Sequence, residues 1–236
     1  MRILYIFPHP DDESFGPAPA MARQLGQGHQ VHLLTLTRGG ATKERHRFGF
    51  SVEEMGRVRH REMLEVEKAL GLSSLQVLDF PDSGLKEVDP LELEEAILES
   101  VGRIRPHVLV TYAVHGISGF HDHLVAHAVV KRVYCELRRG GGEPTPGRLA
   151  LFTVSEAADL GGGPHRLQAS SEDEIDCRVI PSQGEMEVGR RALACYETYA
   201  RVIEEARPLD RLGGEVCFEF FQEAYEPPLS ELTDRL

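Results

Sequence analysis

The sequence of 236 residues predicts an α/β fold in which a mostly parallel sheet carries helices on both faces. Short apolar runs alternate with longer segments of helical periodicity, and this alternation implies right-handed crossovers between parallel strands. Glycine stops and helix-opening residues separate the segments. The length lies between one average domain and two, so we expect one domain over residues 1–236, with a core of 1–155 and a more variable part of 156–236.

The first two-thirds of the chain predict five strands separated by helices. Val52–Leu70 ends at Gly71, and Asp89 and Pro90 open the third helix, which is how helices commonly begin and end. The expected strands are Arg2–Phe7, Gln30–Thr37, 75–80, 107–112 and 148–154. The expected helices are about 13–25, Val52–Leu70, Pro90–Ile104 and 122–138, with a polar loop at 39–50.

The pattern weakens beyond residue 155. The three glycines at 161–163 and the polar run 170–173 favour a mobile loop. A strand at 175–180, a helix at 183–205 and a last strand at 216–221 are then expected. We find no internal repeat.

Charge and composition exclude several classes of protein. The 26 basic and 38 acidic residues give a net charge of −12, which repels phosphate backbones and anionic lipid heads. No apolar run approaches the ~18 residues of a spanning helix. Acidic and proline residues follow the first apolar run where a signal peptide would place small residues, so we expect a strand there and a cytoplasmic protein. The four cysteines are widely separated, and we expect them to be reduced.

Chemically active side chains follow the first strand. The segment Pro8-His9-Pro10-Asp11-Asp12-Glu13 places one imidazole and three carboxylates at the sheet edge where ligands gather in α/β folds. Two prolines restrict the turn and would hold His9 and Asp12 in fixed directions. An alternative interpretation makes Asp11 or Asp12 a helix N-cap, although it leaves His9 unexplained.

A second group of candidates follows the fourth strand. His123 and His127 are four residues apart, so one helix face could present both to a metal. Leu124 stands where a HExxH metalloprotease needs glutamate, which excludes that class. His127 by itself is better explained as an ordinary packed histidine, whereas His123 lies beside Asp122 at a helix start. The histidines of this region are His115, His121, His123 and His127.

Together the two loops offer one histidine and one aspartate from the first and one histidine from the second. Three nitrogen and oxygen ligands leave a coordination position open, which is typical of a catalytic zinc site rather than a structural one. Bound zinc lowers the pKa of its water to about 7, and Asp11 could then accept the proton. The implied chemistry is hydrolysis of a polarised carbonyl.

These two motifs resemble those of the LmbE/PIG-L family of zinc-dependent de-N-acetylases. The resemblance rests on the 8–13 segment with Gly119-Phe120-His121-Asp122-His123 and spans roughly residues 1–135. It implies a Rossmann-like fold, a Zn²⁺ cofactor, and removal of an acetyl group from an N-acetylated amino sugar or glycoconjugate. It also implies that His9, Asp12 and His123 bind the metal and that Asp11 is the general base.

Further likenesses and one departure concern the substrate side. Arg59-His60-Arg61-Glu62 resembles a family element whose arginine contacts substrate, and Thr37-Arg38-Gly39-Gly40 resembles the family's second loop, which makes Arg59 and Arg38 candidates. The family's second motif usually begins with a histidine that stabilises the oxyanion, and Phe120 stands there in this chain. His121 or His115 could take that role, with Asp122 as an orienting partner.

The sequence therefore predicts a zinc-dependent N-deacetylase acting on a small N-acetylated sugar or conjugate. Phe120 motivates the alternative, a catalytically divergent relative that binds metal or sugar on the same fold. A dinucleotide-binding enzyme is disfavoured because the first turn lacks G-x-G-x-x-G and carries acids where pyrophosphate would lie. Neither nucleic acid nor membrane is an expected partner, and the resemblance allows a homo-oligomer.

Overall fold

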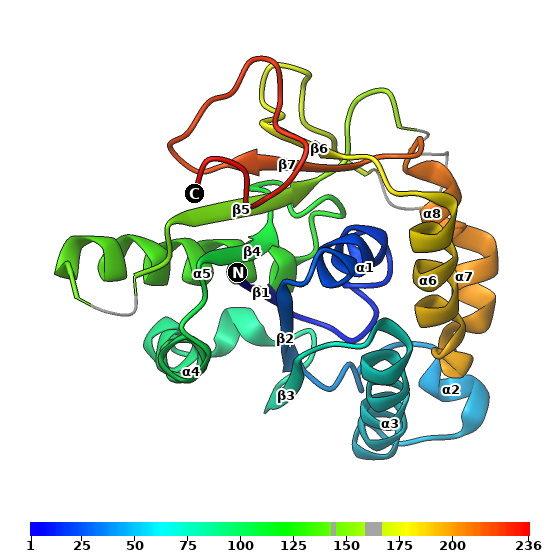
Figure 1. Ribbon diagram of the computed structural model, residues 1–236. Helices are drawn as coiled ribbons and strands as arrows, with labels where there is room; N and C mark the ends of the chain where they lie inside the picture. Colours follow the sequence, from blue (N-terminus) through cyan, green and yellow to red (C-terminus); the bar gives the residue numbers. More distant parts are fainter. Residues whose placement is uncertain (143–144, 159–166) are drawn as a thin grey trace.

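A seven-stranded sheet forms the centre of the computed structural model, which describes residues 1–142, 145–158 and 167–236 (Figure 1). The strand order is β3-β2-β1-β4-β5-β7-β6. Neighbours from β3 to β5 pair in parallel, while β7 runs antiparallel to both β5 and β6. The strands are β1 (Arg2–Phe7), β2 (Gln30–Thr37), β3 (Ser74–Phe80), β4 (Val108–Tyr112), β5 (Arg148–Thr153), β6 (Cys177–Val179) and β7 (Val216–Phe220). The predicted mostly parallel sheet is confirmed.

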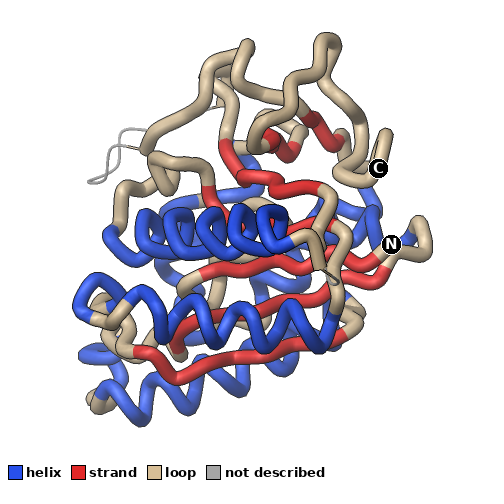
Figure 2. Tube along the Cα trace, turned by 90° about the vertical axis from the view of Figure 1, so that its left-hand side faces the viewer, coloured by secondary structure: helices blue, strands red, loops and turns tan. Residues whose placement is uncertain are grey.

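Helices cover both faces of this sheet, as predicted. Helices α1, α3 and α6 pack on one face, and α4 and α5 pack on the other (Figures 1 and 2). The α-helices are α1 (Ala18–Gly26), α2 (Arg45–Phe48), α3 (Val52–Leu70), α4 (Pro90–Ile104), α5 (His121–Gly140), α6 (Gln183–Ala194), α7 (Ala200–Ala206) and α8 (Pro208–Arg211). Two 3₁₀ turns, η1 (Leu85–Glu87) and η2 (Glu197–Tyr199), complete the described elements.

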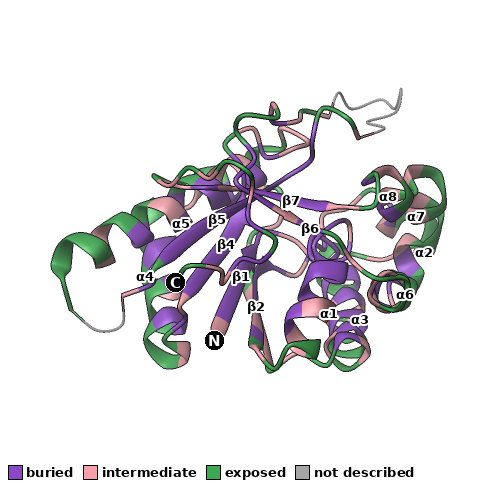
Figure 3. Cartoon of the chain, turned by 45° about the horizontal axis from the view of Figure 1, so that its top comes forward, coloured by how far each residue is buried: buried purple, intermediate pink, exposed green. Residues whose placement is uncertain are grey.

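Strand β1 shows why the sheet is buried on both faces. Ile3, Tyr5 and Phe7 join the core under α1, α3 and α6, whereas Leu4 and Ile6 join the core under α4 and α5. Successive side chains of a strand point to opposite faces, so a strand covered on both sides reads as a continuous apolar run. Figure 3 shows this burial along the central strands. The carboxyl end of β1 therefore emerges from a rigid core.

Helix caps explain why several predicted boundaries are confirmed. The Ser51 side chain accepts a hydrogen bond from the Glu54 amide, while the Glu54 carboxylate accepts one from the Ser51 amide. Asp89 caps α4 in a similar way through the Leu91 amide. Gly71 ends α3 with a φ of 76°, a left-handed conformation that glycine adopts readily.

The first helix begins later than predicted. It starts at Ala18 and not near residue 13, because the preceding residues form turns. Asp11 has a φ of 86°, and its carbonyl accepts hydrogen bonds from the amides of Ser14 and Phe15 at 2.8 and 2.9 Å. The N-cap of α1 is Pro17. The interpretation of Asp11 or Asp12 as a helix N-cap is therefore wrong.

The helix predicted at 183–205 is interrupted. It divides into α6, η2 and α7, because the chain turns to reach two buried carboxylates. The Tyr196 hydroxyl donates to Glu13 at 2.7 Å, and both the amide and the hydroxyl of Thr198 donate to Glu62 at 2.7 Å. These bonds fix the C-terminal part of the chain to α3 and to the loop after β1.

Smaller differences concern the loops and the last strands. The predicted loop at 39–50 contains the short helix α2, and the strand predicted at 175–180 is limited to Cys177–Val179. The predicted glycine loop at 161–163 lies outside the described residues. All four cysteines are free. Within the described ranges, none of the helices combines the length and the apolar character needed to cross a membrane.

A buried arginine attaches the C-terminal residues to the sheet. Arg148 of β5 is fully buried and donates to both carboxylate oxygens of Glu223 at 2.9 and 2.7 Å. It also donates to the carbonyls of Leu232 and Asp234 at 2.7 and 3.0 Å. These bonds replace the water that the guanidinium loses on burial.

We expect Arg148→Met to lower the free energy of unfolding by about 3 kcal/mol, because breaking a buried pair leaves its partners unsatisfied. Urea denaturation followed by circular dichroism measures the change. The control is Arg139→Met on α5, whose side chain is 79% exposed, so it is expected to change stability by less than about 0.5 kcal/mol. Equal stability of the two variants would contradict this account of the C-terminal attachment.

Candidate active site

Asp12 is a buried carboxylate at the carboxyl end of β1. Its Oδ2 atom accepts a hydrogen bond from the backbone amide of His9 at 2.8 Å, and its Oδ1 atom accepts one from the Tyr112 hydroxyl at 2.7 Å. Tyr112 is the last residue of β4, the neighbour of β1 in the sheet. Two adjacent strand ends therefore fix the direction of this carboxylate.

His123 reaches the same carboxylate from the first turn of α5. Its Nε2 atom lies 3.3 Å from Asp12 Oδ1, and its ring stacks on Tyr112 with centroids 4.2 Å apart. Its Nδ1 atom lies 2.9 Å from the carbonyl of Gly116, which can only accept, so Nδ1 donates there and Nε2 is the atom that faces Asp12. Gly116 has a φ of 62°, and a Cβ there would lie 2.8 Å from the His123 Cβ, so glycine permits this close approach.

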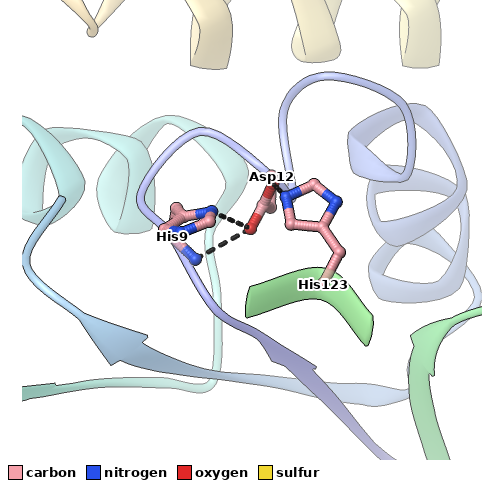
Figure 4. Close-up of side chains that lie close together, drawn as sticks. All are labelled: His9, Asp12 and His123. Atoms are coloured by element: carbon pink, nitrogen blue, oxygen red, sulfur yellow. Dashed lines mark hydrogen bonds and ion pairs between the residues drawn. The ribbon is translucent and has the colours of Figure 1, made fainter. Parts of the chain in front are cut away.

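The third member of the cluster is His9, from the loop after β1. Its Nδ1 atom lies 3.5 Å from Asp12 Oδ2. The potential ligand atoms of His9, Asp12 and His123 all lie within 4.8 Å of one another (Figure 4). Two imidazole nitrogens and one carboxylate oxygen suit a divalent cation of the zinc type, with a position left for a further ligand. The residues thus fit the metal that the sequence predicted, and their role as ligands stays a prediction.

A pair of carboxylates contacts the far side of the His9 ring. His9 Nε2 lies 3.2 Å from Asp122 Oδ2 and 3.3 Å from Asp82 Oδ1. Hydrogen bonding of one ring nitrogen to a carboxylate fixes the tautomer of a metal-binding histidine and leaves the other nitrogen for the cation. The geometry therefore favours Nδ1 of His9 as its ligand atom.

Asp82 was not among the residues predicted from the sequence. It lies in the loop after β3 and accepts a hydrogen bond from the Ala41 amide at 2.6 Å. The carboxyl ends of parallel strands share one edge of the sheet. The sequence prediction used this rule for the loops after the first and fourth strands. The same rule, used for the loop after the third strand, would have found Asp82.

Asp122 contacts a different histidine from the two expected. It was expected to orient His121 or His115, but its Oδ2 atom contacts His9. The same carboxylate accepts hydrogen bonds from the amides of Ser83 at 2.8 Å and Leu85 at 3.2 Å. Asp122 thus joins α5 to the loop after β3 and contacts His9.

Asp11, the expected general base, is paired with Arg59. The Nη2 atom of Arg59 lies 2.5 Å from Asp11 Oδ2. Burial raises the pKa of Asp11 to about 6, and it does so against the opposing charge of Arg59. Asp11 also lines the pocket described below. One carboxylate oxygen is therefore held by Arg59 while the group as a whole faces the space where water or substrate would lie.

Arg59 is engaged mainly by groups of the protein itself. It is 2% exposed, and its guanidinium also donates to the carbonyls of Pro10 at 2.8 Å and Gly39 at 3.3 Å. The guanidinium carbon lies 4.0 Å from the centroid of the Tyr199 ring. Arg59 lines the same pocket as Asp11, so the predicted substrate contact stays a prediction.

The electrostatics of the ligand cluster favour charged forms. Burial raises the pKa of Asp12, but the neighbouring His123 and His9 outweigh it and hold that pKa well below its usual range. Burial lowers the pKa of His9, but hydrogen bonds to Asp12 and Asp122 raise it to about 10. The cluster therefore holds a permanent carboxylate, and a cation that binds through His9 would displace the proton of its ring.

Two predicted substrate residues lie away from this site. His115 accepts a hydrogen bond from the Ile117 amide at Nδ1, and its Nε2 atom contacts Ser170 at 3.2 Å and Thr153 at 3.3 Å. Arg38 pairs with Asp79 at 3.2 Å. Neither His115 nor Arg38 lines the pocket. Their contact with substrate stays a prediction.

A cavity of about 740 Å³ opens at the ligand cluster. Its polar side contains His9, Asp11, Asp12, Asp82, Asp122 and His123. His121, the first residue of α5, is exposed and lines the same cavity, as does Phe120 beside it. Of the two histidines considered for the oxyanion, only His121 lies at the pocket.

Comparisons with known proteins show which sequences this chain resembles. The family model described as "PIG-L: GlcNAc-PI de-N-acetylase" matches residues 4–134. A 1D-myo-inositol 2-acetamido-2-deoxy-alpha-D-glucopyranoside deacetylase of Rhodococcus opacus is 27% identical over 241 residues, covering 85% of this chain and 82% of that protein. A mycothiol S-conjugate amidase of Streptomyces coelicolor is 33% identical over 147 residues, covering 55% of this chain and 50% of that protein.

Solved structures show the same fold. The N,N'-diacetylchitobiose deacetylase from Pyrococcus horikoshii superposes with a TM-score of 0.71 at 15% identity, covering 100% of this chain and 88% of that one. A conserved protein from Thermus thermophilus has a TM-score of 0.66 at 22% identity, covering 95% of this chain and 97% of that one. The Rossmann-like, LmbE-like fold class predicted from the sequence is confirmed.

We expect the purified protein to bind one zinc ion per chain and Asp12→Ala to weaken that binding by more than about 100-fold. The basis is that loss of even an orienting partner costs about 10- to 100-fold. Asp82→Asn alters such an orienting partner, and we expect it to weaken zinc binding by about 10- to 100-fold. Equilibrium dialysis with metal analysis gives the affinities and needs no substrate.

Asp79→Asn is the matched control, since Asp79 belongs to β3 near Asp82 but its side chain is 71% exposed. It is expected to bind zinc as the unaltered protein does. Unchanged affinity in Asp12→Ala would show that the cluster does not hold the metal.

Proposed function

This chain belongs to the PIG-L family of GlcNAc-PI de-N-acetylases, and from that premise we propose that it is a zinc-dependent hydrolase of N-acetylated amino sugars or their conjugates. It would release acetate and leave the free amine. The observation that carries the proposal is the His9–Asp12–His123 cluster with Asp11 beside it at the polar side of one pocket.

The donor set supports zinc as the cation. His9, Asp12 and His123 would hold it, through Nδ1 of His9, the carboxylate of Asp12 and Nε2 of His123. When bound, zinc acts as a Lewis acid toward a carbonyl oxygen and makes water a stronger nucleophile near neutral pH. The protein's contribution is to fix these ligands and their hydrogen-bonded partners in one orientation.

Asp11 is suited to move the proton of the attacking water. Its Oδ2 atom is held by Arg59, and the residue lines the pocket wall. A carboxylate with a pKa near 6 accepts a proton and then returns it, here to the nitrogen of the leaving amine. The positive charge of Arg59 supports the ionised form that the first transfer needs.

His121 is the remaining candidate for stabilising the oxyanion. Phe120 cannot donate a hydrogen bond from its side chain, and His115 is engaged outside the pocket. His121 is exposed at the pocket and stands at the start of α5, where the positive end of the helix dipole also favours developing negative charge.

The second candidate function is a relative that binds metal or sugar without turnover. Phe120 at the position of the family's usual histidine is the observation that favours it. Turnover separates the two candidates, since a binding protein would release no amine.

Domain organisation, cellular compartment and partners complete the proposal. We propose one domain over residues 1–236, since β6 and β7 complete the sheet and residues of α7 and α8 line the pocket. Four free cysteines are consistent with a reducing compartment, and we propose the cytoplasm. The acetylated sugar would be the partner at this site, and self-association stays a prediction.

We expect Asp11→Asn to bind zinc normally and to lose at least about 100-fold in kcat, because the amide cannot accept the proton. Release of free amine from N-acetylglucosamine and its methyl glycosides is the assay. Asp79→Asn serves again as the control and is expected to retain full activity. Undiminished turnover in Asp11→Asn would exclude Asp11 as the base, and absence of turnover in the unaltered, zinc-loaded protein would favour the binding-only candidate.

We expect His121→Ala to lower kcat by about 10²- to 10³-fold, the usual effect of losing one oxyanion donor. The double variant Phe120→His with His121→Ala is expected to recover part of that loss, since it restores an imidazole at the adjacent position. Steady-state kinetics distinguishes kcat from KM. His46→Ala, at an exposed histidine of α2, is the control, and a His121→Ala enzyme as fast as this control would exclude the assignment.

A further inference from the structure

The pocket has two chemically different sides. Its polar side holds the ligand cluster and Asp11, whereas much of the remaining wall is apolar. This apolar wall is formed by residues from the loop after β1, the loop before α5, β5, and helices α7 and α8 with the residue after them. Its main members are Phe15, Ile117, Phe152, Val202, Ala206 and Leu212. The two sides belong to one continuous cavity.

Polar groups beside the apolar wall already have partners. The Tyr199 hydroxyl donates to Thr42 Oγ1 at 2.6 Å, and the Tyr199 ring packs against Arg59. The two carboxylate oxygens of Glu44 accept from Arg47 at 2.7 Å and from Arg201 at 2.5 Å. The Tyr199 hydroxyl hydrogen and both Glu44 oxygens are therefore already engaged within the protein.

Two cations also line the pocket, Lys43 and Arg211. Lysine and arginine side chains donate hydrogen bonds but cannot accept them. These two cations could donate to a sugar hydroxyl, but the apolar side chains offer hydroxyls neither donors nor acceptors, and losing water without replacement is costly. An alkyl or aryl group placed against the apolar wall needs no such partner, and its transfer out of water is favourable.

The size of the cavity agrees with this chemistry. A volume of about 740 Å³ is within the range of about 300–1,000 Å³ that buries drug-sized ligands. One acetylated hexosamine ring with its amide at the cluster fills only part of such a space. The rest of the space is bordered by the apolar wall.

We propose that the substrate carries an alkyl or aryl group, which the apolar wall binds while the amide lies at the His9–Asp12–His123 cluster. The inference rests on the proposed function and specifies the substrate class. Two positions of an amino sugar can supply such a group, namely a longer acyl chain on the nitrogen or an apolar aglycone. The chemistry of binding is the same for both, and the experiment separates them.

Two substrate series provide the test with the zinc-loaded protein. One series lengthens the N-acyl chain of glucosamine from acetyl to hexanoyl, and the other lengthens the aglycone of N-acetylglucosaminides from methyl to hexyl. We expect kcat/KM to rise about tenfold or more along one series, since each buried methylene contributes up to about fourfold, or about 0.8 kcal/mol. The series that rises identifies the source of the apolar group.

Ala206→Trp tests whether the apolar wall binds the alkyl or aryl group, because an indole there would fill space at that wall. We expect the ratio of kcat/KM for the longest and shortest substrates of the rising series to fall at least about fivefold. Val202→Asn, which places an amide at the same wall, is expected to lower the ratio in the same direction and guards against a folding defect. Glu204→Trp is the matched control, because Glu204 is exposed on the same helix, and its ratio is expected to stay unchanged.

Calorimetric binding of hexyl and methyl glucosides, which carry no amide, separates failure of this inference from failure of the proposed function. Tighter binding of the hexyl glucoside that Ala206→Trp abolishes supports the apolar wall even if no amide is cleaved, and that outcome would reject the hydrolase. Cleavage of methyl N-acetylglucosaminide with two flat series and equal binding of the two glucosides would overturn the inference and leave the hydrolase standing.

Discussion

A single buried carboxylate placed between two imidazoles determines the geometry of this site. Burying the charge of Asp12 is costly, and the fold offsets the cost with the His9 amide, the Tyr112 hydroxyl and the nearby His123 ring. These groups come from the end of β1, the end of β4 and the start of α5. The parallel pairing of β1 with β4 therefore sets the distances, and the sheet must be complete before the site can exist.

The charged side chains around Asp12 hold one another in place. Asp82 and Asp122 hold the far nitrogen of His9, and Arg59 holds Asp11. Four carboxylates near one another repel, and His9 and Arg59 offset only part of that repulsion. A divalent ion reduces it further, so the same interactions that position the ligands also favour a cation at the centre.

Local patterns explain which parts could be predicted from the sequence. The loops at 8–13 and 119–123 each contain their chemically active side chains within a few consecutive residues. The caps of helices such as α3 mark the helix ends in the sequence itself. Long-range bonds have no such signal. The break after α6 depends on Tyr196 reaching Glu13, 183 residues away, and the pairing of Arg59 with Asp11 depends on how α3 packs against the first loop. Tertiary contacts of this kind override helical periodicity.

The reacting groups and the apolar wall come from different parts of the chain. The His9–Asp12–His123 cluster lies within residues 9–123, whereas Val202, Ala206 and Leu212 belong to the C-terminal region. That region is attached through Tyr199–Thr42 and Glu44–Arg201. Mutations in 200–212 can therefore remodel which molecules enter without disturbing bond cleavage. Such a division lets natural variation or laboratory evolution diversify selectivity while the chemistry is inherited intact.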